Sequence, residues 1–164
     1  ASRGKVVVAD SRYRIREFLG ITLVTPNEAE ALAAYGLDRM ATEGSIDETV
    51  ADVGERLLRD LRARAVLVTR GNRGMTLFEP ERDPLSVPIS GTSDIVDVSG
   101  AGDTVVSAVT LALAGKASFP HAARLANIAA GVKVMKHGTR PVSSTEVRAA
   151  AWKLAMNGRG PSKN

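Results

Sequence analysis

The sequence has no cysteine and only two histidines, His121 and His137. Without thiolates there is no disulfide framework and no zinc–thiolate site, and two histidines are too few for a multi-histidine metal site. The absence of cysteine also fits a reducing cytoplasm, where we expect the protein to reside. Aromatic residues make up 4% of the chain, and no arginine-rich stripe alternates with them, so the sequence predicts no nucleic-acid partner.

Long apolar runs are absent as well. The most apolar run, Val105–Ala114, is too short to cross a bilayer, so we expect a core helix and no membrane partner. Residues 1–4 lack the shape of a signal peptide and lead straight into a strand, as if the chain began in mid-fold. The 164 residues are 44% hydrophobic and 24% charged with a net charge of +4, which is ordinary for one globular domain.

Predicted strands and helices alternate along the chain. Short β-branched runs and turn signals predict strands at residues 5–10, 21–25, 65–69 and 75–78, with further extended pieces at 85–89 and 95–98. Apolar periodicity and capping residues predict helices at residues 28–35, 46–61, 105–114, 119–136 and 144–156. This alternation indicates an α/β fold with a mainly parallel sheet flanked by helices. The polar tail, residues 157–164, is predicted to be disordered.

Polar or glycine-rich residues stand at the ends of four predicted strands, at Asp10 and at residues 25–27, 69–71 and 97–100. Ligands of open α/β sheets sit beyond the C-terminal ends of the strands. We therefore expect these four places to share one ligand-binding edge.

The most informative stretch is residues 97–104, Asp-Val-Ser-Gly-Ala-Gly-Asp-Thr, which opens into the apolar helix. A helix start collects free N–H groups and the positive end of the dipole, so it can bind a phosphate or a developing oxyanion. Asp103 would repel a phosphate there, which favours a base that takes a proton from an incoming hydroxyl. Taken alone, a generic helix start with an acidic residue near its N-cap explains the segment equally well.

Other glycine-rich phosphate loops fail on particular residues. The dinucleotide pattern needs a glycine three residues after Gly102, where Val105 stands. The P-loop pattern needs serine or threonine after Gly115 and Lys116, where Ala117 stands. A Gly-x-Ser-x-Gly nucleophile elbow is also missing.

Residues 97–104 resemble the signature of the ribokinase (PfkB) family of carbohydrate kinases, and three further segments agree in order and spacing. Residues 25–30 resemble its Asn-x-x-Glu motif, residues 68–74 its Thr-x-Gly-x-x-Gly nucleotide turn, and residues 125–139 its adenine-side helix and closing glycine. Val98 departs from a frequent threonine. Arg70 replaces a frequent apolar residue, and it either reaches a phosphate or is solvated.

The resemblance implies a role for each matching position. Asp103 corresponds to the catalytic base, and the amides of Gly100, Ala101 and Gly102 correspond to the anion hole. The implied contacts to ATP come from Thr69, Gly71, Gly74, Asn127 and Gly138. The implied metal sites are Mg²⁺ organised by Asn27 and Glu30, and a monovalent cation such as K⁺ at Asp97, Ser99, Val134 and Gly138. The residues alone allow simpler readings: a helix-capping pair for Asn27 and Glu30, a hairpin turn for residues 69–74, and a satisfied helix polar group for Asn127.

Members of the family are about twice as long, as fits a larger single α/β domain. Their N-terminal half supplies the first strands, the sugar-binding residues and the lid, so the resemblance implies that residues 1–156 are the nucleotide-binding, catalytic C-terminal half of a sugar kinase domain. The implied reaction moves the γ-phosphate of ATP to a hydroxyl of a sugar or sugar phosphate. Residues 10–12, 69–70, 74–77 and 136–139 look most similar to bacterial D-glycero-β-D-manno-heptose 7-phosphate kinases, so a heptose 7-phosphate is the preferred substrate.

Two alternatives remain open at this point. The chain is either a catalytically inert fragment that only binds nucleotide, or an interaction fragment whose open sheet edge pairs with the missing N-terminal half or with another copy as a homo-oligomer.

Overall fold

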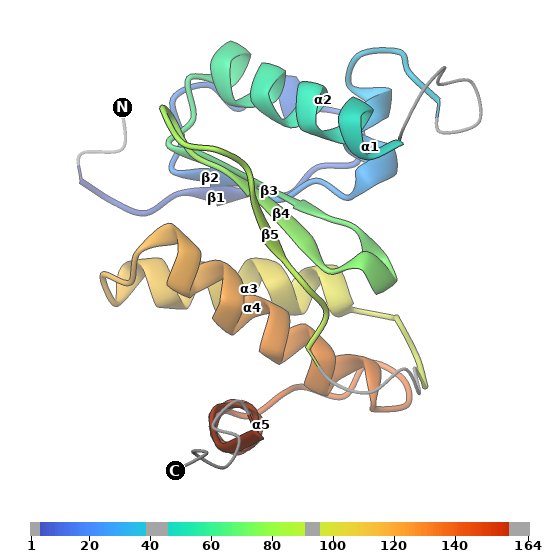
Figure 1. Ribbon diagram of the computed structural model, residues 1–164, viewed down its shortest axis with the longest axis vertical. Helices are drawn as coiled ribbons and strands as arrows, with labels where there is room; N and C mark the ends of the chain where they lie inside the picture. The colour runs from blue at the N-terminus through green and yellow to red at the C-terminus, as the bar shows by residue number, and fades with distance from the viewer. Residues whose placement is uncertain (1–3, 39–45, 91–95, 158–164) are drawn as a thin grey trace, which may run out of the picture.

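The computed structural model describes residues 4–38, 46–90 and 96–157. One sheet runs through the centre of the molecule, with its strands in the order β1–β2–β3–β4–β5 (Figure 1). These strands are β1 (Val8–Ala9), β2 (Leu23–Val24), β3 (Ala65–Thr69), β4 (Met75–Phe78) and β5 (Leu85–Val87).

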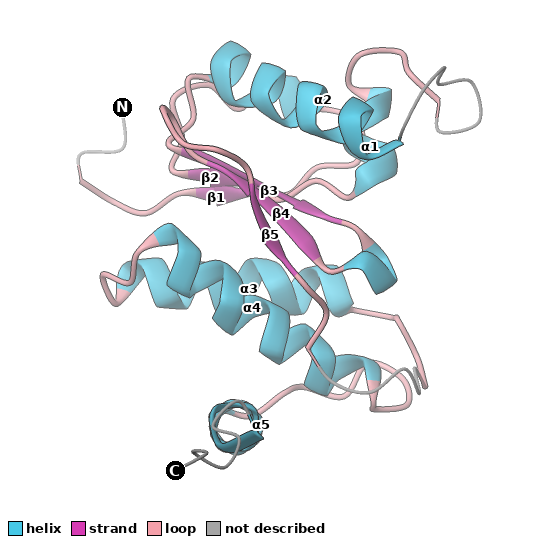
Figure 2. Ribbon diagram, in the orientation of Figure 1, coloured by secondary structure: helices cyan, strands magenta, loops and turns pink. Residues whose placement is uncertain are grey.

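Helices cover both faces of this sheet (Figure 2). On one face lie α1 (Glu28–Ala33) and α2 (Ile46–Leu61), and on the other lie α3 (Ala101–Ala114) and α4 (Phe119–Val134). The last helix, α5 (Ser144–Asn157), lies beyond α4 on the outside of the molecule. Two 3₁₀ turns complete the elements, η1 (Ile15–Glu17) and η2 (Gly71–Arg73).

The predicted α/β class is confirmed, but the sheet is evenly mixed rather than mainly parallel. β1 pairs with β2 and β2 with β3 in parallel, whereas β3–β4 and β4–β5 are antiparallel. The reason lies in the connections: α1 and α2 carry the chain back between β2 and β3, while the short η2 turn and residues 79–84 reverse it directly.

The alternation of side chains along β3 feeds two separate cores. Val66 and Val68 pack with the buried face of α2 on one side of the sheet. Ala65 and Leu67 pack with α3 and the alanine-rich face of α4 on the other. This is the alternation expected of a strand covered on both faces. The two layers of helices thereby fix the edge at which the parallel strands end.

Several predicted boundaries shift. α1 ends at Ala33 and α4 at Val134, each two residues earlier than expected, and α3 begins at Ala101 rather than at Val105. The glycine-containing loop itself therefore forms the first turn of α3. Residues 96–98 form no strand, while residue 95 and residues 158–164 of the predicted tail lie outside the described residues.

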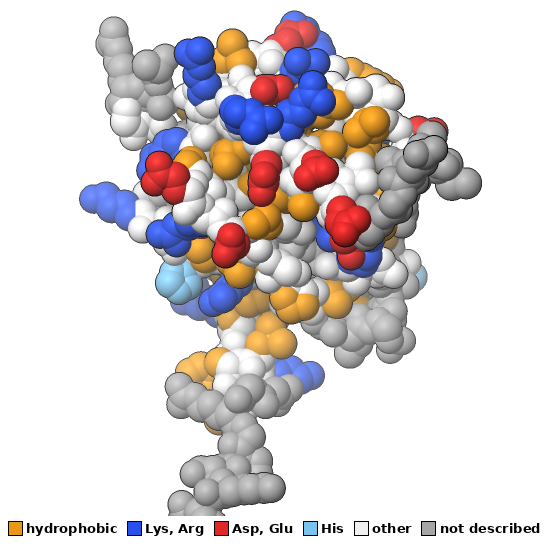
Figure 3. Space-filling view, turned by 45° about the horizontal axis from the view of Figure 1, so that its top comes forward, with side chains coloured by type: hydrophobic (Ala, Val, Ile, Leu, Met, Phe, Trp, Pro, Cys, Tyr) orange, Lys and Arg blue, Asp and Glu red, His pale blue; other side chains and the backbone are white. Residues whose placement is uncertain are grey.

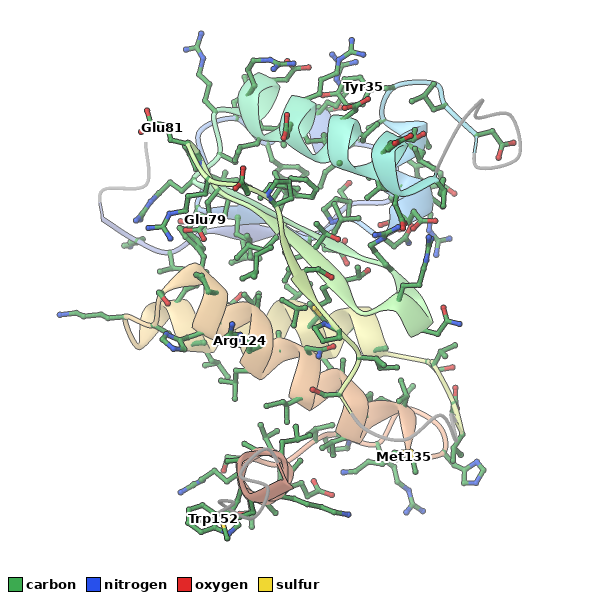
Figure 4. All side chains as sticks on the ribbon, in the orientation of Figure 1. Tyr35, Glu79, Glu81, Arg124, Met135 and Trp152 are labelled. Carbon is green, nitrogen blue, oxygen red and sulfur yellow. The ribbon has the colours of Figure 1, made fainter. Side chains whose placement is uncertain are left out.

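The outer surface carries charges of both signs over the α2 side of the sheet, and apolar side chains around α5 (Figure 3). Trp152 on α5 is 70% exposed and points away from the body of the protein (Figure 4). Of the helices that the structure describes, none has both the length and the apolar character needed to span a bilayer.

Candidate active site

The ends of the three parallel strands lie next to one another. The Thr25 amide, just after β2, donates to the Ala9 carbonyl of β1 at 3.0 Å, and the Thr69 amide at the end of β3 donates to the Pro26 carbonyl at 2.9 Å. Asn27 and Thr69 form an isolated parallel bridge. η2 and the N-terminus of α3 lie at this same side of the molecule (Figure 1). Three of the four expected strand ends thus lie at one edge of the sheet. The fourth, residues 97–100, lies at the same edge but leads into α3 instead of ending a strand.

Gly100 opens α3 as its N-cap in the left-handed conformation, with φ 74° and ψ 12°. Its carbonyl accepts the amide and the hydroxyl of Thr104, at 3.0 and 2.8 Å. The Ala101 amide donates to the Val98 carbonyl at 3.1 Å, so one of the three amides expected in the anion hole is already used. The next amides in the first turn, those of Gly102 and Asp103, have no intrahelical acceptor and stand at the positive end of the dipole.

Three carboxylates converge beside this helix start. Partial burial raises the pKa of Asp10, and the neighbouring carboxylates of Glu30 and Asp103 raise it further, while a hydrogen bond from the Ser11 amide opposes the shift. The sequence placed Asp10 at a strand end but did not include it among the site residues. Only the tertiary structure, in which β1 contacts α3, brings Asp10 near Glu30 and Asp103.

A pocket of about 190 Å³ lies between the nucleotide turn, α3 and α4. It collects seven of the predicted residues: Thr69, Gly71, Gly74, Ala101, Gly102, Asn127 and Val134. It also takes in side chains that the sequence did not single out, of which Met75, Ile89 and Val105 are apolar. Gly138 is not among the described residues that line it. The pocket adjoins the free amides of α3, as a site for a molecule with an anionic end requires.

Asn127 is a satisfied polar group as well as a pocket residue. Its side chain is 5% exposed, and Nδ2 donates to the Pro88 carbonyl at 2.7 Å and to the Ser90 hydroxyl at 3.1 Å. These bonds fasten residues 88–90 against α4 and so build one wall of the pocket.

Asn27 and Glu30 form a reciprocal capping box at the start of α1. Asn27 Oδ1 accepts the Glu30 amide, and Glu30 Oε2 accepts the Asn27 amide, each at 2.9 Å. The helix-capping alternative is therefore present in the structure. The other oxygen, Glu30 Oε1, takes no part in the capping box and lies 4.0 Å from Arg12 Nε.

Arg70 and Arg73 of the nucleotide turn are held by the carboxylates of Glu28 and Asp47. Arg70 Nε lies 3.2 Å from Glu28 Oε2, and Arg73 Nη1 lies 3.1 Å from Asp47 Oδ1. The second guanidinium nitrogens cross over, pairing Arg70 with Asp47 and Arg73 with Glu28. The hydrogen bond from Arg70 is the main cause that lowers the pKa of Asp47. The Arg70 side chain is thus 11% exposed and ion-paired rather than solvated, and it anchors the turn to α1 and α2.

The residues predicted to bind a monovalent cation also come together. Asp97 Oδ1 accepts the Ser99 amide and Oδ2 accepts the Gly138 amide, both at 2.8 Å. Hydrogen bonds from Ser99, followed by that from Gly138, lower the pKa of Asp97 to about 2. Across the described ranges, no group of three or more acidic, histidine or cysteine side chains is arranged to hold a metal directly.

This arrangement, a five-stranded sheet between two helical layers with a pocket and the start of α3 at one edge, is a ribokinase-like α/β fold. The model of the pfkB family of carbohydrate kinases matches residues 2–146, and the chain belongs to that family.

Named relatives and solved structures agree with this assignment. The chain is 43% identical over 160 residues to the bifunctional protein HldE of Azotobacter vinelandii and 41% identical over 160 residues to that of Stutzerimonas stutzeri, covering 97% and 96% of this chain. Escherichia coli phosphofructokinase-2 in complex with potassium superposes with a TM-score of 0.78 at 24% identity, over 93% of this chain and 48% of that one. Arabidopsis thaliana ribokinase complexed with ribose and ATP gives 0.74 at 25% identity, over 88% and 47%. The chain spans 32% of the length of both HldE relatives, and about half of these solved structures.

Proposed function

We propose that the protein containing this chain transfers the γ-phosphate of ATP to a hydroxyl of a sugar or sugar phosphate, with residues 1–156 as its nucleotide-binding and catalytic part. The single observation that carries the proposal is the pocket of about 190 Å³ that runs from the Thr69–Gly74 turn to the first turn of α3. It joins a place for a nucleotide to a place for an anion, and Asp103 stands in the same helical turn.

Each part of the pocket has a task in this reaction. The nucleotide turn and the wall formed by Asn127 hold the nucleotide. The first-turn amides of α3, with Gly100 fixing the turn, face the transferring phosphoryl group and stabilise its charge. The Asp103 carboxylate accepts the proton of the attacking hydroxyl, which is a poor nucleophile until a base relieves it of that proton.

Magnesium fits the carboxylate side of the site. Burial raises the pKa of Asp10 most, and the like charges of Glu30 and Asp103 raise it further; a hard divalent cation would relieve that repulsion. Glu30 would hold the ion through water, and Asn27 would contribute by fixing Glu30 through the capping box. When bound, the ion supplies charge neutralisation on the phosphates.

A heptose 7-phosphate is the acceptor that we favour, and the cytoplasm, where ATP is available, is the expected location. The support is the similarity of residues 10–12, 69–70, 74–77 and 136–139 to heptose 7-phosphate kinases, together with relatives at about 40% identity that carry one common name. Asp10 also lies at the site edge, where an acceptor would be positioned.

The test is Asp103→Asn in the protein that contains this chain, with Asp52→Asn on the exposed side of α2 as the matched control. Loss of a general base should lower turnover about 10²- to 10⁴-fold while ATP affinity stays near normal. The control should keep full turnover. Near-normal turnover of a folded Asp103→Asn protein would remove the role of base from Asp103.

A second candidate is a module that binds nucleotide and pairs through its sheet edge. In the part of the chain that the structure describes, β1 ends the sheet and has a strand neighbour only on its β2 side. Such an edge can accept another strand, from a further segment of the protein or from a second copy. Calorimetry with ATP–Mg²⁺, a kinase assay and sedimentation of this chain separate the cases: binding without turnover in an associated species favours the module.

A further inference from the structure

Of the four residues predicted to bind a monovalent cation, three have oxygens that accept hydrogen bonds from the protein: Asp97, Val134 and Gly138. The Val134 carbonyl accepts two amides, those of Val96 at 2.9 Å and Asp97 at 3.0 Å. A carbonyl oxygen has two lone pairs, so this one has none left for an ion. The Asp97 carboxylate accepts the Ser99 and Gly138 amides. The Val134 carbonyl, one member of the donor set implied by the family resemblance, is therefore not available to a bound K⁺ in this structure.

Another carbonyl of this set, that of Gly138, accepts a hydrogen bond from an ammonium group. Lys133 Nζ donates to it at 2.6 Å. Lys133 is the penultimate residue of α4 and is only 3% exposed. Lysine is almost never buried this completely unless its charge is paired or hydrogen-bonded, because desolvation of an ammonium is costly.

The Lys133 side chain runs from α4 toward the loop that opens α3. Its Cε lies 3.3 Å from the position that a Cβ would take on Gly100, so the lysine stem lies against the N-cap of α3. Hydrogen bonds from Ser99 and then Gly138 lower the pKa of Asp97, and the positive charge of Lys133 adds to that effect. The C-terminus of α4, marked by Met135 in Figure 4, lies beside the start of α3 (Figure 1).

Gly138 is thus held from both sides, by Asp97 at its amide and by Lys133 at its carbonyl. Asp97 in turn holds the Ser99 amide, one residue before Gly100. Hydrogen bonds thus connect the Lys133 ammonium, through Gly138 and Asp97, to the residue before the N-cap of α3.

We propose that the Lys133 ammonium is a built-in monovalent cation, which holds the Gly138 turn and Asp97 in place and makes the anion-binding loop independent of added potassium. An ammonium carries the same single charge as K⁺ and, like K⁺, binds carbonyl oxygens. Lys133 is a positioning residue in this proposal, acting on the phosphate site through Asp97 and Gly100. Its effect on nucleotide binding rests on the proposed function, whereas its effect on stability does not.

The experiment compares potassium chloride with choline chloride at equal ionic strength. The proteins are the wild type, Lys133→Ala, Lys133→Arg and, as the matched control, Lys153→Ala on the exposed side of α5. Two quantities are measured for each: the midpoint of thermal unfolding and, by calorimetry, the affinity for ATP–Mg²⁺.

The wild type and the Lys153→Ala control should give the same midpoint and affinity in both salts. In choline chloride, Lys133→Ala should unfold at a lower temperature than the wild type and should bind ATP–Mg²⁺ about tenfold more weakly, which is about 1.4 kcal/mol. Potassium chloride should restore most of the unfolding midpoint and of the affinity, because an ion replaces the missing ammonium. Lys133→Arg, which keeps a charge, should lose less.

A wild-type protein with a higher unfolding midpoint or a higher ATP–Mg²⁺ affinity in potassium chloride than in choline chloride would overturn the proposal, since an ion would then bind in addition to the lysine. The proposal would also be overturned if Lys133→Ala lost the same midpoint and affinity in potassium chloride as in choline chloride. A lysine with a purely structural role would give that result. If Lys133→Ala does not fold, the proposal is still tested by comparing the wild type and Lys133→Arg in the two salts. If no protein binds nucleotide, the proposed function fails, while the unfolding midpoints still test Lys133.

Discussion

Two glycine-containing turns face each other across the pocket, and they need glycine for opposite reasons. A Cβ on Gly74, in the nucleotide turn, would lie 2.1 Å from the Val87 carbonyl oxygen and 2.9 Å from the Ile89 amide, at a φ of +80°. A Cβ on Gly102, in the first turn of α3, would meet nothing within 4 Å. The first glycine makes room for the protein's own backbone, and the second borders open space in the pocket.

The two turns also differ in what holds them. Arg70 and Arg73 tie the nucleotide turn to Glu28 and Asp47 on the α1–α2 side of the sheet. The α3 turn is held on the other side, through the hydrogen bonds that Asp97 accepts. A substitution at Gly74 should therefore change the stability of the fold, whereas a substitution at Gly102 should change ligand affinity.

The largest expected effect is that of Gly74→Ala on stability. The new methyl group cannot fit between the turn and β5, and the backbone conformation is strained for any side chain, so we expect a loss of about 3–5 kcal/mol. Urea unfolding measures it. Gly71→Ala is the matched control, because Gly71 also has a positive φ of +58° but open space around its Cβ. That control should lose only about 1 kcal/mol, and equal losses at the two positions would contradict a role for close packing at Gly74.

Gly102→Ala should reverse this pattern. Alanine is the better helix former, so the free energy of unfolding should stay the same or rise by about 0.5 kcal/mol. The methyl group would project into the pocket, and ATP–Mg²⁺ affinity should fall about tenfold, which is about 1.4 kcal/mol. Ser107→Ala, on an exposed position of the same helix, is the control for calorimetry. Unchanged affinity in Gly102→Ala would place the anion elsewhere.

The smallest effect is a pH dependence at Asp97. Its hydrogen bonds lower the pKa in the folded protein from the ordinary 3.8 to about 2. The carboxylate therefore stabilises the fold fully above about pH 5, and that contribution is lost as the pH falls from about 4 through 2. In unfolding experiments, Asp97→Asn should differ from the wild type most near neutral pH, and the two should converge near pH 2. A difference that is constant over this range would contradict the link.

Local pattern determined much of this fold. β3 at residues 65–69 and α2 at residues 46–61 have the predicted bounds. A continuous apolar run predicts a strand that is buried on both faces, and apolar residues at helical spacing predict a helix, so both signals come from residues close together in the sequence. The turn after residue 69 predicted the antiparallel β3–β4 hairpin, which is confirmed. The second antiparallel pair, β4–β5, which makes the sheet evenly mixed, was not foreseen, because pairing direction depends on how the connections cross the sheet. The glycine loop was recognised as a helix start, although the structure extends α3 back to Ala101.

The tertiary structure alone decided which charged groups meet. Asp10 lies close enough to Glu30 and Asp103 for their carboxylates to raise its pKa, Arg70 is held by Glu28 and Asp47, and Lys133 reaches the Gly138 carbonyl. None of these pairs leaves a mark in the local pattern, because an ionic contact across layers depends on the packing of helices on the sheet. The sequence by itself determined that a glycine-containing turn opens α3 and that Asp103 stands in its first turn, because both are local features. The packing decided which cation holds that turn in place.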